Sequence, residues 1–219
     1  MTSQSNIKHP MSQRFRGYLP VVIDVETAGF NAATDALLEV SATTLTMDER
    51  GLLLPDVHIS KHLHPFAGAN IEQAAMDFTK IDLTNPLRLS LAEDESSALD
   101  AIFKTVRKAI KAHDCSRGIL VGHNSSFDLS FINAAVERCG IKRNPLHPFS
   151  SFDTATLAAL AYGQTVLAKA CKAAGIAFDN NEAHSASYDT EKTAELFCTV
   201  INTWHQLGGW DLALQTMAE

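Results

Sequence analysis

Two carboxylates stand two residues apart, Asp24 and Glu26, in the otherwise apolar and β-branched run LPVVIDVE. The alternation of side chains along a strand places both carboxylates on one face of the predicted sheet. Two negative charges held this close raise each other's pKa unless a cation offsets them. A divalent metal ion is therefore the ligand that the pair predicts. The alternative is a solvent-exposed pair on an edge strand.

Two further acidic residues follow later in the chain, each with a histidine nearby. Asp128 lies in the run HNSSFD, a few residues past the apolar run GILVGH. Carboxylates just past the C-terminal end of a strand lie where α/β sheets usually place their sites. His184 precedes Asp189 by five residues in HSASYD, which is not a same-face helical spacing, so we expect His184 on the loop before a helix that Asp189 opens. Each residue alone could instead be a surface group or a helix N-cap.

The elements that must position these residues follow from hydrophobic periodicity. Apolar or β-branched runs predict strands at residues 19–26, 37–46, 57–63 (the weakest), 118–123 and 149–153. Apolar stripes and helical composition predict helices at residues 96–112, 127–138, 156–161, 165–174 and 188–205. Three leading strands followed by alternating helices and strands indicate an α/β fold with a mixed sheet and helices packed on it. No internal repeat or long linker divides the chain, so we expect one domain.

The composition is that of an ordinary globular protein. Of the 219 residues, 46% are hydrophobic and 20% are charged, and the mean hydropathy is −0.03. This balance excludes a mainly disordered chain, and no apolar run reaches the roughly 18 residues of a membrane span. The N-terminus lacks the apolar segment of a secretory signal, and the four cysteines are spaced too widely for a CxxC-type zinc site. We therefore expect a cytoplasmic protein with free thiols.

The acidic residues and His184 together resemble the three motifs of a known family, the DEDDh 3′-to-5′ exonucleases. The DxE pair, the HNxxFD segment and the HxxxxD ending occur in the family's order over most of the chain. The tyrosine variant of the family has a tyrosine four residues before the last aspartate, whereas here Tyr188 is adjacent to Asp189. The resemblance implies a ribonuclease H-like α/β fold, a mixed β-sheet flanked by α-helices, in a single exonuclease domain over residues 17–219. Residues 1–16 are then an N-terminal extension with basic residues.

The resemblance also implies the chemistry of the site, two-metal hydrolysis of a phosphodiester. In this interpretation four metal-binding carboxylates hold two Mg²⁺ ions, or Mn²⁺, and His184 is the general base that takes a proton from the attacking water. Oxygen ligands without thiols favour these ions over zinc. The four carboxylates are Asp24, Glu26, Asp128 and Asp189.

Four further segments are similar to the members of the family that trim tRNA, at residues 14–40, 142–149, 163–171 and 207–210. They imply a metal-dependent 3′-to-5′ exoribonuclease that acts as a homodimer and releases nucleoside 5′-monophosphates. Its partners would be tRNA and other stable RNAs with a single-stranded 3′ end, and single-stranded DNA is a further candidate. A DNA proofreading or oligonucleotide-clearing exonuclease is the alternative within this class, and a catalytically silent nucleic-acid-binding module is the alternative outside it.

Four phenylalanines beside the motifs are candidate substrate-binding residues: Phe30, Phe78, Phe127 and Phe149. A base stacked on an aromatic ring gains roughly 1–3 kcal/mol of binding whatever the base, and the resemblance places such rings around the terminal nucleotides. The alternative for each ring is the core, where phenylalanine is usually buried. Ala74 stands where the resemblance predicts an acidic residue, so the preference for the 3′ base stays open.

The net charge of −7, from 25 acidic and 18 basic residues, argues against general nucleic-acid binding but not against a local basic patch. Arg14 and Arg16 precede the first predicted strand, and Lys108 lies on a basic stripe of the helix predicted at residues 96–112. We expect these three residues to bind substrate phosphates. A merely solvated helix face is the alternative for the stripe.

Two smaller sets of polar residues are ambiguous. His58, His62 and His64 share one face of a strand-like run, but they form a weak transition-metal candidate because no fourth ligand is in view. Asp153 ends a predicted strand, where it either supports the site from behind or caps the next helix.

Overall fold

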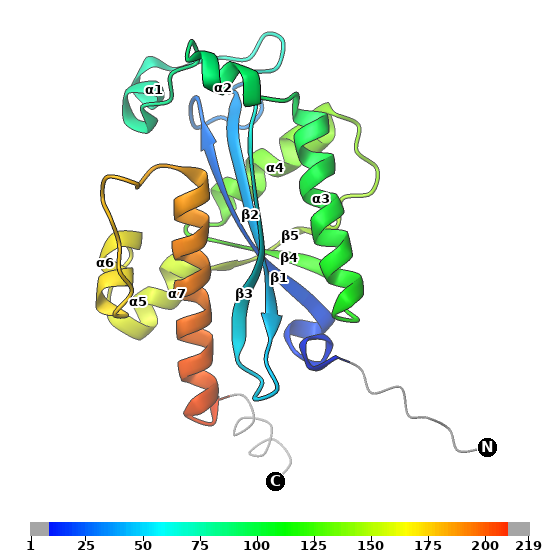
Figure 1. The fold of residues 1–219 in the computed structure, drawn as a ribbon, viewed down its shortest axis with the longest axis vertical. Coiled ribbons are helices and arrows are strands. Elements are labelled where there is room, and N and C mark those ends of the chain that lie inside the picture. Colours follow the sequence, from blue (N-terminus) through cyan, green and yellow to red (C-terminus); the bar gives the residue numbers. More distant parts are fainter. Residues whose placement is uncertain (1–8, 210–219) are drawn as a thin grey trace, which may run out of the picture.

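A five-stranded mixed sheet forms the centre of the molecule in a computed structural model, which describes residues 9–209 (Figure 1). The strands are β1 (Tyr18–Thr27), β2 (Leu37–Met47), β3 (Leu53–His62), β4 (Arg117–Gly122) and β5 (Leu146–Asp153). They lie in the order β3-β2-β1-β4-β5. β2 is antiparallel to β1 and β3, whereas β4 is parallel to β1 and β5. The prediction of an α/β fold with a mixed sheet flanked by helices is confirmed.

Helices cover both faces of this sheet (Figure 1). One face carries α3 (Glu95–Ala112) and α4 (Ser126–Arg138). The other face carries α7 (Ala186–Gln206), with α5 (Thr154–Tyr162) and α6 (Leu167–Ala173) beside it. The short helices α1 (Gln73–Thr79) and α2 (Pro86–Leu91) lie beyond the C-terminal end of β1. Among the described residues, no helix combines the length and the apolar character needed to cross a membrane.

One main core joins the sheet to α3, α4 and α7, because each of these helices turns an apolar face to the strands. On the apolar stripe of α3, Leu99, Ile102, Phe103 and Val106 are fully buried, and Ile110 at its end is partly buried. Asp94 caps α3 by accepting a hydrogen bond from the backbone N–H of Ser97. The four cysteines are free thiols, as their spacing predicted.

The first described residues belong to this core rather than to a separate tail. They form two short 3₁₀ helices, η1 (Pro10–Gln13) and η2 (Phe15–Gly17), and Met11 is fully buried against the sheet. Residues 1–8 of the predicted extension lie outside the described residues. The same holds for residues 210–219, which include the end of the tRNA-trimming similarity at 207–210.

The two edge strands begin earlier than predicted, β3 at Leu53 and β5 at Leu146. Pro55 and Pro148 interrupt the apolar pattern there, and a strand tolerates proline mainly at the edge of a sheet. The helix predicted at residues 165–174 is shorter as α6, and the one predicted at residues 188–205 is longer as α7. The apolar pattern does not predict α2, although Asn85 followed by Pro86 is a typical helix start.

Candidate active site

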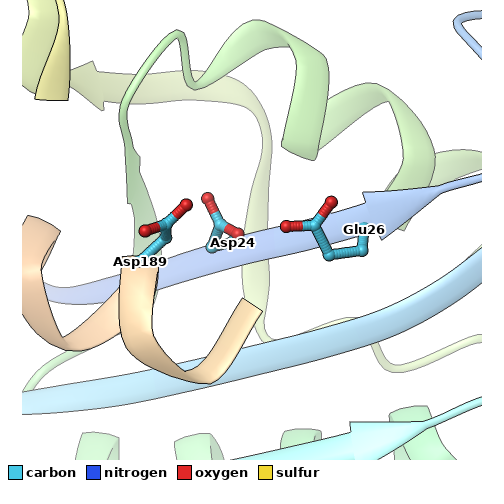
Figure 2. A group of neighbouring side chains, drawn as sticks. All are labelled: Asp24, Glu26 and Asp189. Atoms are coloured by element: carbon cyan, nitrogen blue, oxygen red, sulfur yellow. The ribbon is translucent and has the colours of Figure 1, made fainter. Parts of the chain in front are cut away.

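Three carboxylates from distant parts of the chain meet on the face of the sheet that α7 covers. Asp24 and Glu26 project from β1, and Asp189 comes from the first turn of α7 (Figure 2). One carboxylate oxygen from each residue lies within 4.8 Å of the other two. The structure therefore brings together three of the four carboxylates that the motifs singled out.

The fourth carboxylate, Asp128, lies beside the part of β1 that extends past its pairing with β4. It is 3% exposed in the first turn of α4, and its Oδ1 accepts a hydrogen bond from the backbone N–H of Val25 at 3.1 Å. Gly122 at the end of β4 permits this approach, because a Cβ there would lie only 3.0 Å from Oδ2 of Asp128. Asp128 is thus fixed beside the three-carboxylate group without being part of it.

His184 lies on the loop before α7, as predicted from its spacing to Asp189. Its backbone N–H donates a hydrogen bond to Oδ2 of Asp189 at 3.2 Å. Its backbone has a left-handed φ of 67°, a conformation that is uncommon outside glycine and that clusters at functional sites. The side chain is exposed, and its ring centroid lies 4.3 Å from that of Phe78. His184 lines the same cavity as the three carboxylates and Phe78.

Burial raises the pKa values of all four carboxyl groups, and neighbouring carboxylates of the site add to the shift at Asp24 and Glu26. Burial raises the pKa of Asp24 well above its usual range, and the neighbouring carboxylates add to the shift. Burial raises the pKa of Glu26 to about 8, with a further contribution from Asp189. Burial also raises the pKa of Asp128 to about 8, although backbone hydrogen bonds oppose the shift, and it raises the pKa of Asp189. Without a cation, Glu26 and Asp128 therefore retain protons at neutral pH.

The donor set fits a divalent cation. Oδ1 of Asp189 is buried and has no hydrogen-bond partner, so this oxygen is free to bind a cation. Carboxylate oxygens without thiols or imidazoles are the ligands that Mg²⁺ and Mn²⁺ prefer. Within residues 9–209, no other group of three or more such side chains comes close enough together to hold an ion.

We expect the metal-free protein to lose stability as the pH rises from about 5 to about 8. An unfolded carboxyl group ionises near pH 4, whereas Glu26 and Asp128 ionise at about 8 in the folded protein. The folded state binds more protons in this interval, so the free energy of unfolding falls with pH. Thermal melting across the interval measures the decline, and saturating Mg²⁺ or Mn²⁺ should remove most of it. A pH-independent melting temperature without metal would contradict the crowding of these carboxylates.

A cavity of about 610 Å³ opens beside the carboxylates and His184. Three of the four candidate phenylalanines, Phe30, Phe78 and Phe127, line it. Phe30 is 83% exposed and Phe78 is 62% exposed, so neither ring belongs to the core. The rings of Phe30 and Phe127 are in edge contact, with their centroids 6.1 Å apart. The cavity thus combines an acidic side with an exposed aromatic side.

The remaining candidate substrate-binding residues do not line this cavity. Phe149 is 80% exposed on β5, where its ring contacts that of His147. Arg14 and Arg16 come before β1, at the opposite end of the strand from the carboxylates. Lys108 is exposed on α3. The structure therefore separates the predicted phosphate-binding residues from the cavity of their own chain.

Two of the three clustered histidines, His58 and His62, lie on β3 and contact other polar side chains, and no group of possible metal ligands among residues 9–209 includes them. Nε2 of His58 lies 2.9 Å from Oγ of Ser187 in the first turn of α7, two residues before Asp189. Nδ1 of His62 lies 2.9 Å from Oε1 of Glu39. His58 thereby links the helix that carries Asp189 to the edge of the sheet.

Asp153 caps α5, which is one of the two roles that the sequence left open. Its Oδ1 accepts hydrogen bonds from the backbone N–H groups of Ala155 and Thr156. The same oxygen accepts a bond from the backbone N–H of Asn124 at 3.3 Å, in the loop between β4 and α4. Its charge also adds to the raised pKa of Asp128, so the cap lies close to the site.

Two residues near the site are absent from the sequence-based prediction. Glu39 pairs with Glu26 across β1 and β2, and it contributes to the raised pKa of Glu26. His123 lines the cavity, and its Nε2 donates a hydrogen bond to the carbonyl of Thr165 at 2.8 Å. The sequence does mark both residues: Glu39 is the single acidic residue in the apolar run LLEVS, and His123 is the histidine of HNSSFD.

One protein-family model matches most of the chain. The family model RNase_T, described as exonuclease, matches residues 21–197, a range that includes all four carboxylates and His184. The chain belongs to this exonuclease family. Members of the exonuclease family depend on divalent metal ions, and the carboxylate group supplies ligands of the kind that such ions require.

Solved structures of other exonucleases share the fold. Escherichia coli Exonuclease I in complex with a dT13 oligonucleotide superposes with a TM-score of 0.63 and 18% identity, covering 87% of this chain and 42% of that chain. The zinc ion bound form of an E. coli Exonuclease I–ssDNA complex gives the same values. Exonuclease I from Methylocaldum szegediense gives 0.61 and 16%, covering 84% and 40%. This chain thus spans about two-fifths of the length of these proteins.

Proposed function

We propose that the chain is a metal-dependent 3′-to-5′ exoribonuclease that trims the 3′ ends of tRNA and other stable RNAs and releases nucleoside 5′-monophosphates. The observation that carries the proposal is the cavity in which three carboxylates face exposed phenylalanine rings. Rings of this kind suit unpaired bases at a chain end. Carboxylates of this kind suit the cations that accompany a scissile phosphate.

Each residue of the site has a role in this proposal. Two bound Mg²⁺ or Mn²⁺ ions supply the positive charge that stabilises the attacking and leaving oxygens. Asp24, Glu26 and Asp189 would supply the direct ligands, and Asp128 would help to hold one ion, mainly through water. His184, exposed at the cavity and tied to Asp189 through its backbone, takes a proton from the attacking water.

RNA is the substrate class that the sequence favours. The four segments at residues 14–40, 142–149, 163–171 and 207–210 are similar to ribonuclease T, a tRNA-trimming member of the DEDDh exonucleases. One departure from that pattern falls within the candidate substrate site, since Ala74 lines the cavity where an acidic residue is expected. DNA is the second candidate, because the similar E. coli Exonuclease I structures hold a dT13 oligonucleotide and ssDNA.

A direct competition tests the substrate class. Labelled tRNA and a DNA single strand with the sequence of its 3′ tail are incubated with the protein and Mg²⁺, with and without EDTA. We expect EDTA-sensitive release from tRNA at least about tenfold faster than from DNA, a difference of about 1.4 kcal/mol in transition-state binding. Faster release from DNA would favour the second candidate, and metal-independent binding without release would favour a silent module.

In this proposal the basic residues bind RNA phosphates across the interface of a homodimer. They do not line the cavity of their own chain, so we propose that the patch of one subunit holds the body of the RNA whose 3′ end enters the cavity of the other. The members of the patch are Arg14, Arg16, Lys104, Arg107, Lys108 and Lys111. The last four are exposed on α3.

The double variant Arg107→Ala, Lys108→Ala should weaken tRNA binding and flatten its salt dependence. Each lost phosphate contact lowers the slope of log affinity against log salt by about 0.7–0.9. Binding titrations between about 50 and 200 mM salt measure this slope. Arg50→Ala, which removes an exposed arginine paired with Asp48, is the matched control. An unchanged slope in the double variant would show that the basic stripe of α3 is a solvated helix face that does not bind RNA.

A further inference from the structure

A buried ion pair joins the two helices on the face of the sheet opposite α7. Arg138, the last residue of α4, donates from Nε and Nη2 to the two carboxylate oxygens of Glu95 at 3.1 and 2.7 Å. The Glu95 side chain is 5% exposed and opens α3, so each charge also lies at the helix end that favours it. Both oxygens of Glu95 are thus satisfied by one planar guanidinium group.

The remaining arm of this guanidinium group reaches the loop that carries Phe30. Nη1 of Arg138 donates to the carbonyl of Ala32 at 2.8 Å, two residues beyond Phe30. The guanidinium carbon also lies 4.2 Å from the ring centroid of Phe66. Arg138 therefore contacts both the loop after β1 and the loop after β3.

These two loops form one unit that leads to α1 and Phe78. The backbone N–H of Asn70 donates to the carbonyl of Thr34, and the N–H of Glu72 donates to the carbonyl of Ala28, each at 2.8 Å. Helix α1 begins immediately after Glu72 and carries Phe78. The backbone that bears Phe30 is thus hydrogen-bonded to the backbone that leads to Phe78.

The packing of the rings does not explain their placement. Phe30 is 83% exposed, and its ring makes an edge contact with the ring of Phe127. Few apolar contacts hold such a side chain, so its position depends on the hydrogen bonds of its loop. The bond from Arg138 ties that loop to α4, the same helix whose first turn carries Phe127 and Asp128.

We propose that Arg138 is a positioning residue for substrate stacking, which holds the Phe30 loop at a fixed place relative to the carboxylates on β1 and α4. This inference rests on the proposed function, because it assigns Phe30 to the substrate. The role requires an arginine, because the planar guanidinium group donates hydrogen bonds to Glu95 and to the carbonyl of Ala32 at the same time. A lysine retains the charge beside Glu95 but cannot make all three bonds.

A double-mutant cycle with Phe30 tests the proposal on a short single-stranded oligoribonucleotide. For Arg138→Lys we expect KM to rise about five- to tenfold with kcat changed by less than about threefold, as for coupled neighbours. In a Phe30→Ala background the same substitution should change KM by less than about twofold, because the ring that it positions is gone. Equal effects in both backgrounds would overturn the positioning role.

Two further variants separate positioning from stability. Glu95→Gln removes the ion pair but leaves the amide oxygen and the Arg138–Ala32 bond, so the melting temperature should fall while KM stays near its original value. Arg50→Lys is the matched control, an exposed arginine at the turn between β2 and β3. A KM that follows the melting temperature across all variants would overturn the proposal. A Phe30→Ala variant with unchanged KM would remove the stacking role itself, and with it the positioning role.

Discussion

Asp24→Asn should reduce metal-dependent cleavage by at least about a hundredfold, because a lost metal ligand removes several kcal/mol of charge stabilisation. The same variant should make the metal-free protein more stable at pH 8. Burial and the neighbouring carboxylates raise the pKa of Asp24, so its charge opposes folding when no cation is present. We expect the melting temperature of the metal-free variant to rise by about 2–4 °C for each kcal/mol of repulsion removed.

Two measurements on the same preparation check the predicted loss of activity and the predicted gain in metal-free stability. Nucleotide release with Mg²⁺ reports the loss of activity, and thermal melting with and without Mn²⁺ reports both the gain in stability and the loss of metal-induced stabilisation. Asp56→Asn is the matched control, since it makes the same chemical change at an exposed position on β3. Activity within about tenfold of the unsubstituted protein would contradict the assignment of Asp24 as a metal ligand.

Phe30→Ala and Phe78→Ala should leave the protein folded and weaken substrate binding or turnover by about tenfold or more, as expected for stacking worth roughly 1–3 kcal/mol per base. Both rings are largely exposed, so their removal opens no cavity in the core. The melting temperature should therefore change little. Titration with tRNA and thermal melting of the same samples separate the two effects.

Phe131→Ala supplies the contrast within the same structure. Phe131 is fully buried on α4, and its ring centroid lies 5.0 Å from that of Phe127. Its removal should cost about 3–5 kcal/mol of folding free energy. If Phe30→Ala and Phe78→Ala behave like Phe131→Ala, with a large fall in melting temperature and unchanged affinity per folded molecule, the account of 3′-end recognition is wrong.

The sequence predicted the parts of the site that depend on local periodicity. The period of two along a strand is enough to place Asp24 and Glu26 on one face, and the non-helical spacing from His184 to Asp189 is enough to place the histidine on a loop. The fold class follows in the same way, from the order of apolar strands and amphipathic helices. Each of these features depends on residues close together in the chain.

The parts that sequence did not predict depend on pairing and packing between distant segments. Glu39 reaches the site through its register opposite Glu26, and register is set by the whole sheet. Phe149 is selected on the same sequence grounds as the other three phenylalanines, but it lies on β5 and does not line the cavity. The three hydrogen bonds of Arg138 join α4 to α3 and to the loop after β1, its cation–π contact with Phe66 adds the loop after β3, and no motif marks these contacts.

The most direct test of the central claim is to follow which end of the substrate is lost. A tRNA that carries one label in its 3′-terminal nucleotide and another at its 5′ end is incubated with the protein, Mg²⁺ and, in parallel, EDTA or the Asp24→Asn variant. The account predicts that the 3′ label is released first, as a nucleoside 5′-monophosphate, while the 5′ label stays on a slowly shortening RNA, and that both EDTA and the variant stop the release. Internal fragments, release from the 5′ end, or release that persists in EDTA would contradict it.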